Sequence, residues 1–199
     1  NRNDLCLGDE MRVIAGKARR LQLKSIEGFD TRPTTDRIKE TLFNIINNEL
    51  EQCCFLDLFS GSGGIGIEAL SRGAKKAYFV ENSKKAVQCI KDNLKATRLE
   101  EEAAVLYMSV SVAIRELNHT NTYFDFVFMD PPYNKLYERE VLEELKDTCL
   151  IDSDSTIIVE ASLETDFSYV NELGYQITKE KIYKTNKHIF LKLSGDSYD

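Results

Sequence analysis

A glycine-rich segment and three acidic residues are the parts of this chain whose residue types and spacing best suit chemistry. Residues 55–66 read FLDLFSGSGGIG, so an apolar run containing Asp57 ends in a turn of small residues. Such a turn lets the backbone approach a ligand closely, and the N–H groups at the start of a following helix then face that ligand. The segment therefore predicts a buried strand, a binding loop and a helix N-terminus.

The glycine spacing alone leaves the ligand open. Residues 61–66 satisfy the G-x-G-x-x-G pattern of dinucleotide loops but lack the Gly-Lys-Ser/Thr ending of a phosphate loop. Glu81 follows the next predicted strand, where an acid can accept hydrogen bonds from both hydroxyls of a ribose. A helix-capping or solvent-facing acid is the plain structural alternative. We favour a ribose-bearing cofactor, which leaves NAD and S-adenosylmethionine.

The tetrapeptide Asp130-Pro131-Pro132-Tyr133 distinguishes these two cofactors. Its prolines stiffen the loop and remove two N–H donors. Asp130 and the Pro131 carbonyl then offer two adjacent acceptors, and Tyr133 offers an aromatic face. This combination fits the exocyclic amine of a planar base, because binding both amine hydrogens localises the nitrogen lone pair for attack on a methyl donor. A plain proline turn is the structural alternative.

Alternating strands and helices must position these residues. Apolar runs predict strands, and helical spacing predicts helices between them, which together give a parallel sheet with right-handed crossovers. The expected strands cover residues 53–58, 76–80, 104–108, 123–129 and 156–159, and the expected helices cover residues 65–72, 83–97, 112–117 and 138–146. Since parallel strands end at one edge, Asp57, Glu81 and Asp130 should meet in one crevice.

The two ends of the chain depart from this alternation. Residues 175–183 and 188–193 flank a Thr185-Asn186 turn, which predicts an antiparallel hairpin. Residues 11–23 predict a basic β-hairpin, and a helix of about four turns follows before the central strand. We expect residues 1–10 to be a non-native or disordered extension, residues 11–52 a hairpin-and-helix segment, and residues 53–199 the cofactor-binding catalytic domain.

Composition restricts the class of protein. A chain of 199 residues fits one domain, and its net charge of −7 argues against a nucleic-acid binder. Residues 12–39, however, hold eight basic and three acidic residues, which suits a polyanion contact or a merely solvated face. We expect no metal site, because His119 and His188 are the only histidines and five scattered cysteines form no C-x-x-C. We also expect a cytoplasmic protein that does not enter a membrane.

Three segments resemble a known family. Residues 11–16 (MRVIAG), 32–44 (RPTTDRIKETLFN) and 56–63 (LDLFSGSG) are similar to the bacterial RsmD family of class I S-adenosylmethionine-dependent methyltransferases, and the likeness runs from residue 11 to about residue 193. The resemblance implies a Rossmann-like α/β fold, with a seven-stranded, mostly parallel sheet, the C-terminal antiparallel hairpin and a small N-terminal hairpin-and-helix extension. It also implies methylation of guanine N2 in 16S ribosomal RNA, at the guanine numbered 966.

The resemblance also assigns roles to matching positions. The target base would be held by Asp130, Pro131, Pro132 and Tyr133. The cofactor would be held by Asp57, Phe59, Gly61, Ser62, Gly63, Glu81, Asn82, Ser109, Arg32 and Thr34. RNA would be contacted by Lys17, Arg19, Arg20 and Arg37. At Ser109 the sequence departs from relatives that place an acid or amide there for the adenine amine, and a serine hydroxyl is the acceptor on offer.

The partner implied is 16S ribosomal RNA within a small-subunit assembly particle, met by a monomeric enzyme. A DNA adenine-N6 or cytosine-N4 methyltransferase remains the alternative, because it would use the same loop chemistry. An NAD-dependent oxidoreductase would need a proton-handling group near the nicotinamide, and neither histidine is well placed for it. A non-catalytic nucleotide-binding module would tolerate loss of Asp130.

Overall fold

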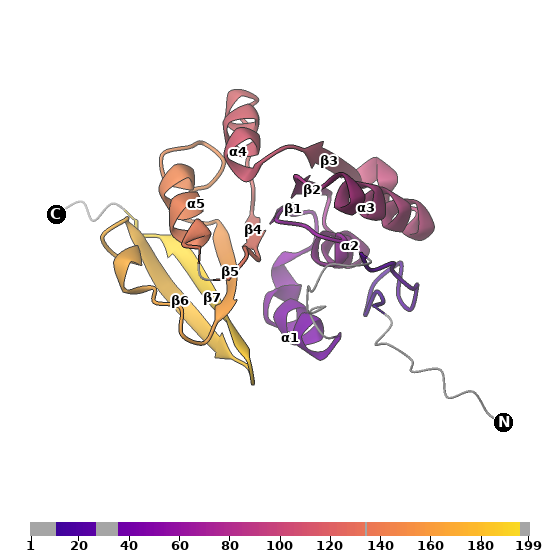
Figure 1. Cartoon of the computed structure of the whole chain (residues 1–199), viewed down its shortest axis with the longest axis horizontal. Helices are drawn as coiled ribbons and strands as arrows, with labels where there is room; N and C mark the ends of the chain where they lie inside the picture. Colours follow the sequence, from indigo (N-terminus) through magenta and orange to yellow (C-terminus); the bar gives the residue numbers. More distant parts are fainter. Residues whose placement is uncertain (1–10, 27–35, 134, 196–199) are drawn as a thin grey trace.

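The computed structural model describes residues 11–26, 36–133 and 135–195. The expectations for residues 1–10, Arg32 and Thr34 therefore lie outside the described residues. Within them the chain forms one seven-stranded sheet with helices on both sides (Figure 1). The strands are β1 Cys54–Leu58, β2 Lys76–Glu81, β3 Ala103–Tyr107, β4 Phe126–Met129, β5 Thr156–Ser162, β6 Tyr175–Ile182 and β7 Asn186–Leu193.

The helices alternate with the strands as far as β5. They are α1 Asp36–Ile46, α2 Gly64–Ser71, α3 Lys84–Thr97, α4 Val110–His119 and α5 Tyr137–Leu145, with short 3₁₀ turns η1 Asn47–Glu49, η2 Glu100–Glu102 and η3 Ser168–Val170. The helix expected at residues 112–117 is longer than predicted, because Ser109 caps it and its side chain accepts the Val112 N–H. The helix before the central strand is α1 followed by η1.

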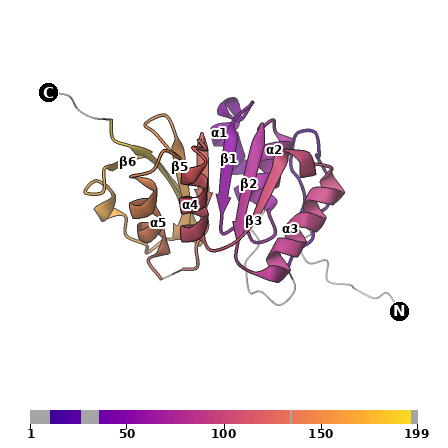
Figure 2. The ribbon, with the colours of Figure 1, turned by 90° about the horizontal axis from the view of Figure 1, so that it is seen from above.

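The sheet order is β3-β2-β1-β4-β5-β7-β6, which confirms the expected architecture. The first five strands pair in parallel, and β7 pairs antiparallel with both β5 and β6. Figure 2 shows β1, β2 and β3 side by side and pointing the same way. The order reverses between β1 and β4, and ligands of open α/β sheets bind at the carboxyl ends of strands beside such a reversal.

Two apolar cores lie on opposite faces of the sheet. On one face, α1, α2 and α3 pack on strand residues such as Phe55, Phe79 and Phe128. On the other face, α4 and α5 pack on alternate strand residues such as Leu56 and Met129. Both faces of the central strands are thus buried, which explains why these strands are continuous apolar runs in the sequence.

The expected basic hairpin over residues 11–23 is only partly formed. Arg12 and Gln22 make one isolated antiparallel bridge, and no strand is present in this segment. The reason is that the backbone N–H groups of Ile14 and Ala15 donate to the side chain of Glu68 on α2 instead of to a partner strand. We call residues 11–24 the N-terminal arm.

The described residues offer neither a membrane-spanning helix nor a cluster of metal ligands. None of the helices there is long and apolar enough to cross a membrane. Within the same residues, no group of three or more His, Cys, Asp or Glu side chains is arranged to hold a metal ion.

Candidate active site

The glycine loop between β1 and α2 turns sharply at the carboxyl edge of the sheet. Phe59, Gly61 and Gly63 have positive φ angles of 57°, 58° and 83°. A positive φ is easy for glycine but costly for Phe59, so the surrounding structure must hold that residue in place. Two backbone hydrogen bonds do so locally, from Ser60 N–H to the Val80 carbonyl and from Gly63 N–H to the Ser60 carbonyl.

Asp57, on β1, holds the far end of this loop through a hydrogen bond to the first turn of α2. Its side chain is 1% exposed, and Oδ2 accepts the Gly66 N–H at 3.1 Å, in the first turn of α2. Burial raises the pKa of the Asp57 carboxyl well above its ordinary value, while the hydrogen bond from Gly66 acts in the opposite direction. In this conformation Asp57 fixes the start of α2 relative to β1 and does not line the adjoining cavity.

Glu81 joins the end of β2 to the glycine loop. Its Oε2 accepts the Gly61 N–H at 2.9 Å, and its Oε1 accepts the N–H groups of Asn82 and Ser83, both at 3.0 Å. A carboxylate has about four acceptor positions, so acceptor capacity remains for a ligand hydroxyl. Ser83 is also the N-cap of α3. The three hydrogen bonds therefore connect the Glu81 carboxylate both to the loop before α2 and to the start of α3.

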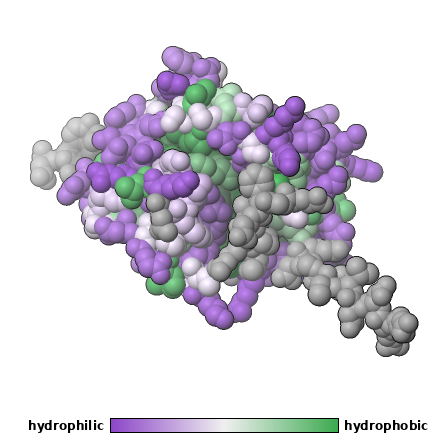
Figure 3. Space-filling model, viewed as in Figure 1, coloured by the Kyte–Doolittle hydropathy of each residue, from purple (hydrophilic) through white to green (hydrophobic). Residues whose placement is uncertain are grey.

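A cavity of about 350 Å³ opens beside Glu81. It includes five residues predicted from the sequence, namely Phe59, Glu81, Asn82, Ser109 and Pro132, together with Val80, Met108, Val110, Ser111, Tyr137, Glu140, Val141 and Glu144. Figure 3 looks onto this edge and shows hydrophobic surface near α4, surrounded by hydrophilic side chains. An acid at one end and apolar walls beyond it suit a ribose linked to a planar base.

Ser109 lies in this cavity but already has a structural role. Its Oγ accepts the Val112 N–H at 3.4 Å as the N-cap of α4. A hydroxyl keeps a second lone pair and a proton, so Ser109 can still contact a ligand. Nearby, Ser111 donates to Glu144 Oε1 at 2.6 Å, which places a carboxylate of α5 in the same wall.

The Asp130–Tyr133 segment follows β4 on the other side of the strand reversal. Pro131 is buried, Pro132 lines the cavity, and Tyr133 is 46% exposed. Asp130 is partly buried, and its side chain forms a hydrogen bond with Glu160 of β5. Burial first, and the Glu160 carboxylate second, raise the pKa of Asp130 well above its ordinary value.

Glu160 and the residues behind it were missed by the sequence analysis. Glu160 is 3% exposed, and its Oε1 accepts a hydrogen bond from Asn186 Nδ2 at 3.0 Å and lies 3.0 Å from His188 Nε2. The predicted strand ended at Val159, so Glu160 is another acid at a strand end, like Asp57, Glu81 and Asp130. That pattern could have identified it.

The cavity wall supplied by α5 was also missed. Tyr137, Glu140, Val141 and Glu144 all line the cavity, and the ring of Tyr137 lies 6.2 Å from that of Phe59, centroid to centroid. Sequence periodicity predicted the helix but could not show that its side chains reach a loop some eighty residues earlier in the chain.

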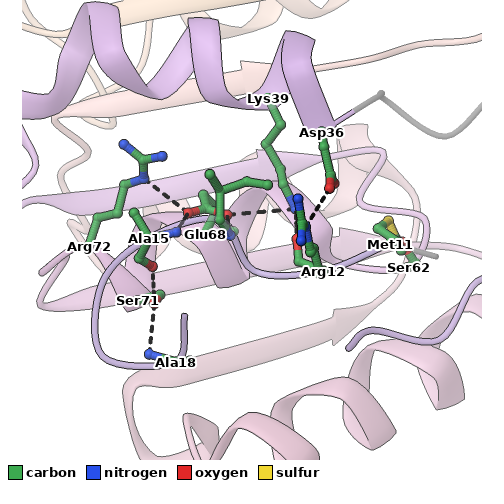
Figure 4. A network of polar contacts seen from close by, with 12 residues as sticks. Met11, Arg12, Ala15, Ala18, Asp36, Lys39, Ser62, Glu68, Ser71 and Arg72 are labelled. Atoms are coloured by element: carbon green, nitrogen blue, oxygen red, sulfur yellow. Dashed lines mark hydrogen bonds and ion pairs between the residues drawn. The ribbon is translucent and has the colours of Figure 1, made fainter. Parts of the chain in front are cut away.

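The N-terminal arm is fixed to α2 by a buried polar network (Figure 4). Glu68 is fully buried and accepts the N–H groups of Ile14 and Ala15 at 2.8 and 3.1 Å and Arg72 Nε at 2.9 Å. Lys39 of α1, 2% exposed, lies 3.6 Å from Glu68 Oε1 and donates to the Arg12 carbonyl at 2.6 Å. Burial lowers the pKa of Lys39, and Glu68 opposes that shift.

This network reaches the glycine loop. Met11 Sδ lies 3.7 Å from Ser62 Oγ, and a Cβ on Gly64 would lie 3.3 Å from the same sulfur atom. Asn93 of α3 donates to both the Lys24 and the Ser62 carbonyls, at 3.0 and 2.9 Å. Both ends of the N-terminal arm therefore pack beside the loop.

The predicted RNA-binding residues lie in two places: Lys17, Arg19 and Arg20 are together in the N-terminal arm, and Arg37 is on α1. Lys17 N–H donates to the Ser71 carbonyl at the end of α2, and Lys17 Nζ pairs with Glu102 at 2.7 Å, just before β3. Lys17 and its neighbours Arg19 and Arg20 thus lie at the opposite end of α2 from the glycine loop, and the two arginines are exposed. Arg37 is exposed near the start of α1, where Arg12 pairs with Asp36 at 2.8 Å.

Comparison with known proteins agrees with this geometry. Residues 11–192 match the family described as Conserved hypothetical protein 95. The putative rRNA methyltransferase YlbH of Bacillus subtilis is 36% identical over 181 residues, which cover 87% of this chain and 98% of that protein. The ribosomal RNA small subunit methyltransferase D of Haemophilus influenzae is 35% identical over 174 residues, covering 86% and 88% respectively.

A solved structure shares the fold. The putative methyltransferase yhhF of Escherichia coli superposes with a TM-score of 0.77 at 28% identity, covering 93% of this chain and 98% of that one. The sheet order and the antiparallel β7–β6 pair are therefore those of a Rossmann-like methyltransferase fold. The chain belongs to the Conserved hypothetical protein 95 family, which is the RsmD family.

Proposed function

We propose that this chain is an S-adenosylmethionine-dependent ribosomal RNA methyltransferase that methylates the N2 amine of a guanine in 16S RNA, of the guanine-966 type. The observation that supports this best is the position of the Asp130–Tyr133 segment. It lies at the end of β4, directly across the strand reversal from the glycine loop, and its Pro132 shares a cavity with Glu81. Family membership and the names of the relatives support the substrate class.

The residues present fit the cofactor. Glu81 already accepts three of about four possible hydrogen bonds, so one acceptor position remains for a ribose hydroxyl. The apolar side chains of Val80, Met108 and Val110 suit an adenine ring. Gly61 and Gly63 allow close approach to the methionine part. S-adenosylmethionine supplies an activated methyl group on a sulfonium, so this reaction needs positioning and charge stabilisation from the protein.

The target base would be held on the other side of the strand reversal. Asp130 and the Pro131 carbonyl accept the two amine hydrogens, and the ring of Tyr133 stacks on the base. Positive charge that develops on the amine nitrogen is stabilised by the carboxyl group of Asp130. We place this reaction in the cytoplasm, on a small-subunit assembly particle, with the enzyme as a monomer.

Substitutions in this segment test the proposal. Asp130→Ala should lower turnover at least a hundredfold while leaving S-adenosylhomocysteine binding within about threefold of the original protein. Tyr133→Ala should lower turnover more than Tyr133→Phe, because the proposal uses the ring face and not the hydroxyl. Methylation by Asp130→Ala at nearly the original rate would contradict the assigned role.

A further inference from the structure

Asp130, which directly follows β4, begins a row of polar side chains that continues through Glu160 of β5 to His188 of β7. Met129, the last residue of β4, pairs with Val159 of β5, so Asp130 and Glu160, the next residues along the chain in each case, are neighbours. Glu160 in turn pairs directly with His188 of β7. The side chains of Asp130 and Glu160 are hydrogen-bonded, and Glu160 Oε1 lies 3.0 Å from His188 Nε2.

The surroundings of His188 indicate its protonation state and its tautomer. Tyr183 OH lies 3.0 Å from His188 Nδ1, and His188 Nε2 faces the Glu160 carboxylate. A neutral imidazole carries one proton, and we assign it to Nε2, where it faces the Glu160 carboxylate. Nδ1 then accepts the Tyr183 hydroxyl. Burial lowers the pKa of His188 to about 4, so this imidazole is neutral at pH 7.

The contacts also indicate which of the two carboxyl groups, Asp130 or Glu160, carries the negative charge. Two carboxyl groups in contact do not both ionise near neutral pH, so Asp130 and Glu160 share one proton. Glu160 receives N–H donors from both Asn186 and His188, which stabilise its ionised form. Asp130 is then the group that holds the proton. The other titratable groups facing the pair are Asp57 on β1 and Tyr183 in the turn between β6 and β7.

We propose that Glu160 is a positioning residue for methyl transfer: it holds the negative charge of the pair and keeps Asp130 neutral. Asp130 then meets the target amine with its carbonyl oxygen, while its hydroxyl donates to Glu160. This inference rests on the proposed amine methylation and adds to it a second acid, on a different strand, that does not touch the substrate.

The proton movement balances. As the amine nitrogen bonds to the methyl carbon, the carbon–sulfur bond breaks and its electron pair stays on sulfur, which becomes a neutral thioether. The nitrogen passes one proton to the facing oxygen of Asp130, and Asp130 passes the proton on its other oxygen to Glu160. Asp130 stays neutral throughout, Glu160 becomes neutral, and the proton leaves to water after the product is released.

Infrared spectroscopy tests the shared proton without a substrate. At pH 7 the protein should show a protonated-carboxyl band that disappears in both Asp130→Asn and Glu160→Gln, because either change removes one member of the pair. Labelling with ¹³C-aspartate should shift this band, since the proton lies on Asp130. Absence of the band, or a band that the aspartate label leaves unmoved, would overturn the proposal. Asp57→Asn is the matched control and should retain the band.

Turnover supplies a second, independent readout. Asp130→Asn should be at least tenfold more active than Asp130→Ala, because its amide also presents a carbonyl to the amine and a donor to Glu160. Glu160→Gln should change the pH dependence of turnover, since Asp130 then titrates alone. Equal activity of the two Asp130 variants, or an unchanged pH profile in Glu160→Gln, would refute the role of Glu160. Should the original protein transfer no methyl group, the proposed function fails while the infrared result still decides the state of the pair.

Discussion

The Glu81 carboxylate accepts the Gly61 N–H at 2.9 Å, so an acid at the end of β2 holds the turn that follows β1. Parallel pairing of the two strands brings the residues together across twenty positions of sequence. The same carboxylate lines the cavity, and one residue therefore shapes the loop and faces the ligand.

Replacing Glu81 should weaken cofactor binding. Glu81→Ala leaves the Gly61 N–H without its acceptor and removes the acceptor for ribose, which should lower S-adenosylhomocysteine affinity about 10- to 100-fold. Glu81→Gln retains one acceptor and should lose less. Isothermal titration calorimetry measures both, with the exposed Glu101→Ala as the control. Equal affinities for Glu81→Ala and the control would show that Glu81 does not bind the cofactor.

The Glu68 network should be essential for stability. Glu68→Ala leaves the Lys39 ammonium buried without its counter-charge and two backbone N–H groups without an acceptor, which should lower the free energy of unfolding by about 3–5 kcal/mol. Urea unfolding measures this against Glu40→Ala, which changes an exposed acid of α1. A loss no larger than that of the control would mean that the network contributes little.

Stability should also depend on pH through His188. Its pKa is lowered from 6.5 to about 4 by burial, so the unfolded chain binds this proton at a higher pH than the folded chain does. The contribution of the neutral imidazole is therefore present above pH 6.5 and is lost as the pH falls towards 4. Between pH 7 and pH 5, the protein should lose about 2 kcal/mol more than His188→Gln does. Urea unfolding at the two pH values measures this difference. Equal losses of unfolding free energy in the original protein and in His188→Gln would contradict the lowered pKa of His188.

The basic tip of the N-terminal arm should contribute to RNA affinity but not to cofactor binding, because it lies at the far end of α2 from the glycine loop. Reversing charge at Arg19 and Arg20 should reduce the slope of log affinity against log salt by about one for each phosphate that the tip no longer binds. Lys184→Glu, at an exposed lysine in the turn between β6 and β7, is the control. An unchanged slope would exclude phosphate binding at this tip.

Local sequence patterns predicted the parts of the site that lie at strand ends. The glycine loop, Glu81 and the Asp130–Tyr133 segment all follow apolar runs, and a parallel sheet brings such ends to one edge. Five of the predicted residues line the cavity. The three acids expected to meet in one crevice do not all line it: Glu81 does, but Asp57 and Asp130 do not. Asp57 lies on the face of β1 that packs against α2, where its side chain accepts the Gly66 N–H.

Long-range packing explains what local patterns missed. Glu68 lies within an apolar helical run, and nothing nearby in sequence shows that Lys39 and two N–H groups of the N-terminal arm will meet it. His188 reaches Glu160 only through the antiparallel register of β5 and β7. The partial loss of the expected hairpin has the same cause, since Glu68 takes the hydrogen bonds that a second strand would have made.

Methyl transfer from labelled S-adenosylmethionine tests the central claim most directly. The substrates are small-subunit assembly particles, naked 16S RNA and duplex DNA, followed by nucleoside analysis of each product. The account predicts label in RNA as N2-methylguanosine, and its loss with Asp130→Ala. Methyladenine or methylcytosine in DNA, or no transfer to any substrate while the cofactor is bound, would contradict it.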